Sequence, residues 1–277
     1  MKSAEAAEIV GDLASQQWGL VTSAQAKAAG VDLPSLRRLA NHGVLVRVRH
    51  GVYATTATAL SAELELKAQW LALQPELLAA DRTNDTELAA TAVVSHETAA
   101  DLWGIGDLWP DGAHFTVADR RQSRQPDVHF HRAVIDGTDW MVHPDAGLPV
   151  TVVSRTVADL ARAGHEPGHL LDMVADAARK RLVDEDELLE RLDGLEAAFG
   201  VDAGDRDGMA DLLAEHFPDE QPDKRTLSLF SEALRPLQEQ VAGLSSALAP
   251  QVAWNQALHD ALDLPMRDSI TESPRVS

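Results

Sequence analysis

The residues from Gly19 to Ala54 constrain the fold more than any other part of the chain. They read as two short helices followed by two short strands. Thr22 or Ser23 can begin the first helix, because a side-chain oxygen at that position accepts a backbone N–H that has no partner within the helix. Gly30 can end it in the left-handed conformation that follows many helices. Asp32 can cap the second helix in the same way as the first.

The second helix has one apolar face, and a strand-like pattern follows it. Leu36, Leu39 and Ala40 recur at the spacing of a buried helix face. The residues on or near the outer face are Ser35, Arg37, Arg38, Asn41 and His42. Beyond Gly43 the run VLVRVRHGVY alternates apolar and basic residues, as a strand does, and its His-Gly pair supplies a bend. The stretch therefore predicts a winged helix-turn-helix, whose second helix is the recognition helix and whose hairpin is the wing.

The charge of this stretch opposes that of the whole chain. Between Leu33 and Tyr53 there are four arginines and no acid, in a protein of net charge −20. A basic patch on an acidic protein indicates an anionic partner at that place. The predicted DNA-binding residues are Ser35, Arg37, Arg38, Asn41, Arg47 and Arg49.

The two pairs of arginines are expected to do different work. Arg37 and Arg38 would enter a DNA groove, and Arg47 and Arg49 would contact phosphates, because a guanidinium group matches both guanine edges and phosphate oxygens. The alternative is a winged helix used for protein contact, with its arginines solvated or paired with acids elsewhere in the chain.

The rest of the chain predicts an α+β protein with a helical tail. We expect a winged helix-turn-helix domain over 1–58, a mixed α/β domain over 59–200, and an acidic connector with an amphipathic helical tail over 201–277 whose end is disordered. Alternating short helices and strands favour α+β over a doubly wound sheet. The expected strands are 92–94, 114–118, 128–131, 140–142 and 150–153, and the expected helices are 3–18, 61–80, 95–104, 154–163, 167–181 and 184–192. Residues 81–87 read as a polar loop.

Two features near the C-terminus have more than one interpretation. Residues 184–220 hold 14 acids and two bases, which is typical of a solvated face or mobile connector; a docking surface for a basic partner is the alternative. Seven apolar residues from Leu227 to Leu248 follow a heptad spacing, with Pro236 inside it. We favour an amphipathic helix folded back on the body over a dimerisation or partner helix.

Three runs resemble one family. The run LRRLANHGVLVRVRHGVYA resembles the N-terminal domain of AbiEi-type antitoxins, the transcriptional-regulator half of type IV toxin–antitoxin pairs. The runs VVSHETAADLWGI (93–105) and LPVTVVSRTVADLA (148–161) extend the resemblance over about residues 19–195. The resemblance implies binding to inverted repeats in the protein's own promoter, where the winged domains of two copies could bind one palindrome. It also implies that the second domain counters a nucleotidyltransferase toxin, without necessarily forming a stable complex.

Histidines are the main candidates for other chemistry. The β-rich stretch contains His114, His129, His131 and His143. His129 and His131 would share a strand face, as metal ligands can. We favour structural roles, because the chain has no cysteine and no supporting carboxylate is recognisable from sequence. We therefore expect no metal and no cofactor.

Catalytic motifs are also weak. Ser95 and His96 could suggest a nucleophile and base, but neighbours on a helix point in different directions, so Ser95 is interpreted as a helix cap. Ser154 is interpreted in the same way, and Arg155 with Asp159 as an ion pair on a helix surface. The sequence has no P-loop, GxGxxG or HExxH motif. A nuclease would need carboxylates on strands and a following lysine, a pattern that is missing after residue 195. No catalytic residue is predicted.

Composition limits the covalent cross-links and the cellular location that we expect for this protein. With no cysteine there are no disulfides, and no apolar run reaches the ~20 residues of a membrane span. A signal peptide is not recognisable, so a cytoplasmic location is expected. The alternatives to an antitoxin are a stand-alone transcriptional regulator and a protein–protein scaffold, and an enzyme has the least support.

Overall fold

The computed structural model describes residues 2–121 and 125–217. They belong to one of two compact units, which spans Met1–Pro218. The fold is mixed helix and sheet and begins with a winged helix, as predicted. The predicted seam at 227–248 and the predicted disordered end lie outside the described residues. No helix in the described ranges is long and apolar enough to cross a membrane.

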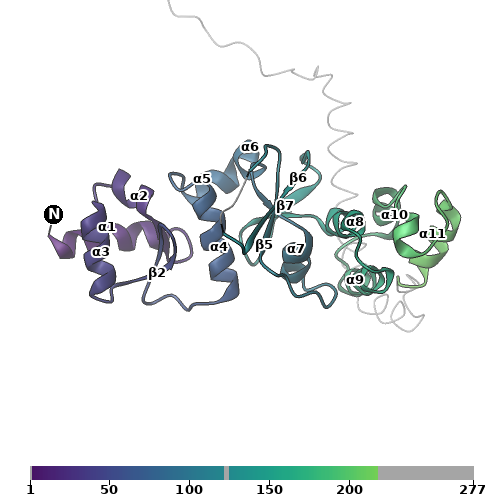
Figure 1. The fold of residues 1–277 in the computed structure, drawn as a ribbon, viewed down its shortest axis with the longest axis horizontal. Coiled ribbons are helices and arrows are strands. Elements are labelled where there is room, and N and C mark those ends of the chain that lie inside the picture. Colours follow the sequence, from purple (N-terminus) through teal and green to yellow (C-terminus); the bar gives the residue numbers. More distant parts are fainter. Residues whose placement is uncertain (1, 122–124, 218–277) are drawn as a thin grey trace, which may run out of the picture. The chain divides into compact units, whose positions relative to one another are not determined.

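The N-terminal head is a small winged helix (Figure 1). Its elements are α1 (Ser3–Ser15), β1 (Leu20–Thr22), α2 (Ser23–Ala28), α3 (Leu33–Asn41), β2 (Leu45–Arg49) and β3 (Val52–Thr55). The strands form an antiparallel sheet in the order β1-β3-β2. Apolar residues of α1, α2 and α3 and of the sheet form one core: Ala6, Val10, Ala14, Val21, Ala26, Val31, Leu36, Leu39, Leu45 and Tyr53.

Capping residues set where the two central helices begin. Thr22, and not Ser23, caps α2: its Oγ1 accepts from the backbone N–H of Gln25, whose side chain accepts from the Thr22 N–H in return. This reciprocal pair is a capping box. Asp32 caps α3 through the backbone N–H of Ser35, as predicted. The recognition helix therefore starts at a position fixed by local chemistry.

The second part of the chain is built on a five-stranded mixed sheet. Its strands are β4 (Val93–Val94), β5 (Ala113–Val117), β6 (Val128–Arg132), β7 (Trp140–Val142) and β8 (Pro149–Thr151), in the spatial order β6-β5-β4-β8-β7. The pairs β5·β6 and β4·β8 are parallel, and β4·β5 and β7·β8 are antiparallel. The two edge strands therefore differ in direction: β6 is parallel to its neighbour β5, and β7 is antiparallel to its neighbour β8.

Helices enclose this sheet and continue beyond it. They are α4 (Ala62–Leu73), α5 (Ala79–Asn84), α6 (Thr86–Ala89), α7 (His96–Trp103), α8 (Val153–Ala163), α9 (Pro167–Lys180), α10 (Glu185–Arg191), the 3-10 helix η1 (Glu196–Phe199) and α11 (Arg206–Ala214). The predicted polar loop at 81–87 is wrong, because α5 and α6 occupy it. Arg82 explains the error: it is fully buried, its guanidinium lies 3.5 Å from the centre of the Trp70 ring, and burial lowers its pKa to about 9.

The acidic segment folds into packed helices. Its apolar residues Leu188, Leu192, Phe199, Met209 and Leu213 are buried with those of α8 and α9. Of its acids up to residue 217, only Glu196 is buried, and the others remain at the surface. A mobile connector is therefore the wrong interpretation for residues 201–217, where α11 is anchored by its apolar side chains.

A shared core joins the head to the second part. Leu20, Val52 and Ala54 of the head belong to the same apolar cluster as Trp70 of α4 and Phe115 of β5. Buried amides add to it: Gln25 Nε2 donates to the carbonyl of Leu77 at 2.6 Å, and Gln17 Oε1 accepts from the N–H of Ala79 at 3.2 Å. The wing is therefore in contact with α4, which touches all three strands of the head.

Candidate nucleic-acid interface

The outer face of α3 carries the cationic side chains that the sequence predicted. Arg37, Arg38, Asn41 and His42 are exposed, while Leu36 and Leu39 anchor the opposite face in the head's core. The hydrogen bonds from Ser35 to Asp32 hold the pKa of that carboxyl below its ordinary value, with a smaller contribution from the charge of Arg38. The cap is therefore ionised at neutral pH, and the first turn of α3 is firmly set.

Ser35 does not lie on the outer face. It is 3% exposed, and its Oγ accepts a hydrogen bond from Arg38 Nη2 at 2.8 Å. The prediction of an outward-facing Ser35 is wrong, because the helical turn that Asp32 caps directs this small side chain against the head. Its visible role is to orient Arg38, whose remaining guanidinium donors stay available.

The wing arginines differ from each other. Arg47 is exposed; its Nε donates to the carbonyl of Arg49 at 3.2 Å, and its Nη2 lies 2.9 Å from His50 Nδ1. These contacts hold the guanidinium beside the bend of the wing. The bend needs Gly51, which has φ +78°, a conformation that residues with a side chain rarely adopt.

Arg49 is turned inward. Its side chain is 8% exposed and forms ion pairs with Asp127 at 2.9 Å and Glu65 at 3.2 Å. Both carboxylate oxygens of Asp127 accept from it, as does Gln125. The register between β2 and β3 shifts between Arg47 and Arg49, and a bulge of this kind redirects a side chain. Strict alternation would have placed both arginines on one face, and the irregular register prevents it.

The other three arginines of the head form no ion pair with the described residues. Within residues 2–121 and 125–217, Arg49 is the only one of the four that has a carboxylate oxygen within 4.0 Å of its guanidinium nitrogens. Three apolar side chains of α3 and the wing region, which the sequence pattern does not distinguish, are also exposed: Leu33 is 44% exposed, Val44 41% and Val46 38%. Cationic and apolar groups side by side can contact phosphates, base edges and thymine methyl groups.

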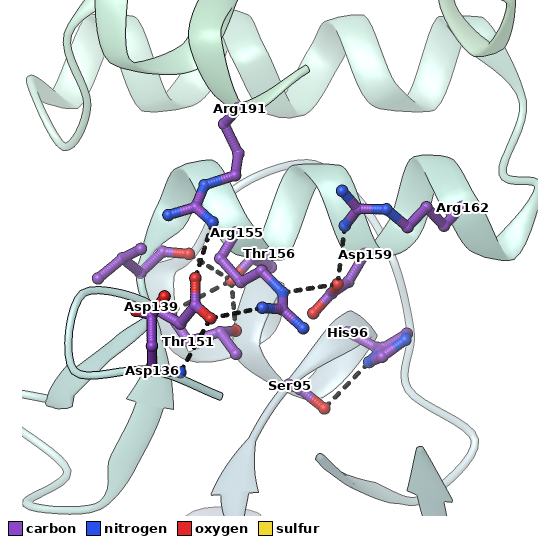
Figure 2. Close-up of polar contacts among 11 residues, drawn as sticks. Ser95, His96, Asp136, Asp139, Thr151, Arg155, Thr156, Asp159, Arg162 and Arg191 are labelled. Atoms are coloured by element: carbon purple, nitrogen blue, oxygen red, sulfur yellow. Dashed lines mark hydrogen bonds and ion pairs between the residues drawn. The ribbon is translucent and has the colours of Figure 1, made fainter. Parts of the chain in front are cut away.

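A second group of arginines lies on and around α8 (Figure 2). Arg155 donates from Nε to Asp159 at 2.8 Å and from Nη1 to Asp139 at 2.7 Å. Arg191 reaches the other oxygen of Asp139, also at 2.7 Å, and Arg162 reaches Asp159 at 3.2 Å. The predicted pair of Arg155 and Asp159 exists, but its side chains are only 10% and 7% exposed. A helix-surface pair is therefore the wrong description, because α10 and the loop before β7 contribute partners that cover it.

Of the two predicted serine caps, one is right in position only and the other is wrong. Ser95 is the N-cap residue directly before α7, as predicted, but its side chain makes no capping hydrogen bond, and its Oγ lies 3.0 Å from His96 Nδ1. The side chains of Ser95 and His96 thus meet, contrary to expectation, because His96 has a left-handed φ of 54°. Burial lowers the pKa of His96 to about 3, and Ser95 is fully buried. Ser154 lies within α8, which begins at Val153, and donates to Glu187.

The predicted group of four histidines contains three that meet. His114 of β5 lies beside His129 and His131 of β6, and His96 stacks on His131 with ring centres 3.4 Å apart. His143 lies elsewhere, against Trp103, and accepts from the backbone N–H groups of Asp145 and Ala146. Strand pairing in register, which the sequence does not reveal, decides which histidines come together.

The head matches a known family model. Residues 8–56 match the family model described as transcriptional regulator, AbiEi antitoxin. Over these residues the chain is similar to AbiEi antitoxin regulators. The match covers α3 and the wing and confirms the resemblance predicted from their sequence; the runs at 93–105 and 148–161 lie outside it.

Solved structures also resemble this chain, and one of them shows a partial likeness. It is described as the crystal structure of RV2827C protein from Mycobacterium tuberculosis, and it aligns with a TM-score of 0.48 and 19% sequence identity over 78% of this chain and 83% of that chain. No curated protein matches the sequence.

Proposed function

We propose that this protein is a DNA-binding regulator of the antitoxin type, which represses its own operon through the winged head. The observation that carries the proposal is the pair Arg37 and Arg38, exposed on a capped recognition helix without an acid in ion-pair range among the described residues. The same helix lies within the stretch that matches the antitoxin regulators. The partner is double-stranded DNA with an inverted repeat.

The geometry suggests a division of roles on DNA. Helix α3 would lie in the major groove, with Arg37, Arg38 and Asn41 at base edges, because an arginine fork pairs with guanine and an amide pairs with adenine. Arg47 would contact phosphate from the wing. Arg49 would reach a phosphate only after leaving Asp127 and Glu65, and Ser35 would act through Arg38.

The charge of the remaining chain supports selective binding. The net charge of −20 opposes general attraction to DNA, so that only the basic face of the head is attracted to the duplex. If two heads bind one palindrome as a dimer, the half-sites should be spaced by a helical turn of about 34 Å or a multiple of it.

Titration of the upstream DNA of the gene tests this proposal. The double variant Arg37→Ala/Arg38→Ala should bind the operator more weakly, by about 1–3 kcal/mol for each guanine-reading arginine, and should discriminate less between operator and unrelated duplex. The control is Arg206→Ala, which removes an exposed arginine of α11. Equal operator affinity of the double variant, the control and the unchanged protein would refute the assignment.

We further propose that the second domain counters a nucleotidyltransferase toxin encoded beside this gene, without needing a stable complex. This part rests on the resemblance of residues 93–105 and 148–161. Co-expression with the neighbouring toxin tests it: the Arg37→Ala/Arg38→Ala variant should still restore growth while it no longer represses the promoter. Loss of both activities in this correctly folded variant, or no rescue by the unchanged protein, contradicts separable functions.

A protein–protein scaffold is the second candidate, and the exposed Leu33, Val44 and Val46 favour it. Salt separates the two functions. DNA binding weakens steeply as salt rises, because counterions are released from the duplex, whereas docking through apolar side chains does not. Binding of a partner protein that persists in high salt, without any DNA binding, would favour the scaffold.

A further inference from the structure

The pairing of β5 with β6 brings two imidazoles and a carboxylate together outside the head. In this parallel pair His114 stands opposite His129. Asp111 precedes β5 by two residues and folds back over both. Gly112 makes this possible, because a Cβ there would lie 2.6 Å from the carbonyl oxygen of Asp127. The loop can therefore approach the start of β6 closely, and Ala113 N–H donates to that same carbonyl at 2.9 Å.

The three donor atoms converge at the spacing of a metal site. Asp111 Oδ1 lies 3.0 Å from His114 Nε2 and 3.2 Å from His129 Nε2, and one ligand atom from each of the three residues lies within 4.8 Å of the others. Ligands bound to zinc at 2.0–2.1 Å in a tetrahedron are about 3.3 Å apart. His129 Nε2 is buried and makes no hydrogen bond within the described ranges, although it is close to Asp111. An ion between them would satisfy it.

A second carboxylate and a third imidazole lie at the other ring nitrogen of the central ligand. His114 Nδ1 is hydrogen-bonded to His131 Nε2 at 3.0 Å, and Glu97 Oε2 lies at the same distance as an ion-pair contact, which leaves Nε2 directed at Asp111. Glu97 Oε1 is in turn held by His165 Nε2 at 2.9 Å. Metal-binding histidines usually have such a carboxylate on the other ring nitrogen, which fixes the ring and raises its basicity.

We propose that Asp111, His114 and His129 bind one divalent transition-metal ion, with Zn²⁺ as the best fit. Two imidazoles and one carboxylate suit zinc, whereas Mg²⁺ and Ca²⁺ prefer all-oxygen sites. Asp111 is 78% exposed and His129 35%, so the site opens to solvent on one side. Three protein ligands leave a position there for water or for a donor atom of another molecule. From sequence alone these histidines are expected to be structural, because Glu97 and Asp111 are not recognisable as partners before the strands pair.

Metal titration of the full-length protein tests the site. After chelation and removal of metal, Co²⁺ serves as an optical probe and Zn²⁺ is measured by calorimetry. We expect one equivalent of each to bind and Zn²⁺ to displace Co²⁺, with millimolar Mg²⁺ having no effect. Asp111→Ala and His129→Ala should each weaken binding by more than about tenfold, and Glu97→Gln by about 10–100-fold, as is typical of supporting carboxylates.

The controls separate a built site from surface imidazoles and from misfolding. His169→Ala removes an exposed histidine of α9 and should bind metal as the unchanged protein does. Asp111 is 78% exposed, so its replacement should leave the fold intact, which circular dichroism checks. Absence of stoichiometric binding by the unchanged protein, or equal affinity in Asp111→Ala and His129→Ala, would overturn the proposal.

Discussion

The arginines of α3 and those around α8 are the same residue type in opposite surroundings. Arg37 and Arg38 are exposed and have no ion-pair partner among the described residues, whereas Arg155, Arg162 and Arg191 share two buried aspartates. The first pair can meet a ligand from outside. The second group is occupied within the chain and joins α8, α10 and the loop before β7 (Figure 2).

The comparison shows that basic residues alone do not identify an anion-binding surface. What matters is whether acids of the same chain reach them, because a guanidinium that carboxylates already hold is not available to an anion from outside. Arg49 illustrates an intermediate case: it belongs to the basic stretch of the head, yet its partners come from α4 and from the residue before β6. We therefore predict effects on folding stability for the buried arginine network and effects on DNA binding for the arginines of the head.

The largest effect is expected in the buried network. Asp139→Ala should lower the free energy of unfolding by about 3–5 kcal/mol, because it leaves Arg155 and Arg191 without the charge that they share. Urea unfolding measures it. Asp193→Ala is the control, since it breaks only the exposed pair with Arg206, which is worth about 0–1 kcal/mol. Similar losses in both variants would show that burial does not distinguish the two networks.

An intermediate effect is expected from the two wing arginines. Arg47→Ala should weaken binding to every duplex and reduce the salt slope by about 1, because one phosphate contact is lost. Arg49→Ala should change the slope less, since Asp127 and Glu65 already hold its guanidinium. Mobility shifts at several salt concentrations measure both slopes.

The wing comparison can be sharpened by releasing Arg49. Asp127→Asn removes the charge that binds this guanidinium from both oxygens and should increase affinity for DNA of any sequence. Equal salt slopes for Arg47→Ala and Arg49→Ala would mean that DNA readily displaces Asp127 from Arg49. The two wing arginines would then not differ in how they contact phosphate.

The smallest effect concerns the cap of α3. The pKa of Asp32 is lowered in the folded protein, chiefly by its hydrogen bonds with Ser35. A lowered folded pKa means that the stabilisation is fully present above the ordinary value of 3.8 and is lost as pH falls through the lowered pKa. Thermal unfolding of Asp32→Asn and of the unchanged protein should therefore differ at neutral pH and converge in strong acid. If the two proteins still differed in thermal stability in strong acid, the stabilising effect of Asp32 would not come from its charge.

Local signals predicted much of the fold. Caps, glycines and apolar spacing located α2, α3 and the wing, and β7 lies where it was expected, because each depends on neighbours within a few residues. The signals failed where partners are distant. The sequence places the buried Arg82 in a loop because the Trp70 ring that contacts it is distant in the chain. It makes Ser154 a cap because Glu187, which accepts its hydrogen bond, is also distant in the chain.

The candidate interface also has features that local sequence predicts and features that depend on distant residues. By itself, the sequence determined that a basic helix-turn-helix and wing exist, and that Arg37, Arg38 and Asn41 lie on the outer face of the helix, because helical periodicity fixes which residues share a side. Only the tertiary structure decided that Ser35 turns inward, that Arg49 binds Asp127, and that Asp111, His114 and His129 converge. Those outcomes depend on strand register and on which surfaces pack together. Neither can be deduced from local sequence patterns, because the residues involved are far apart in the chain.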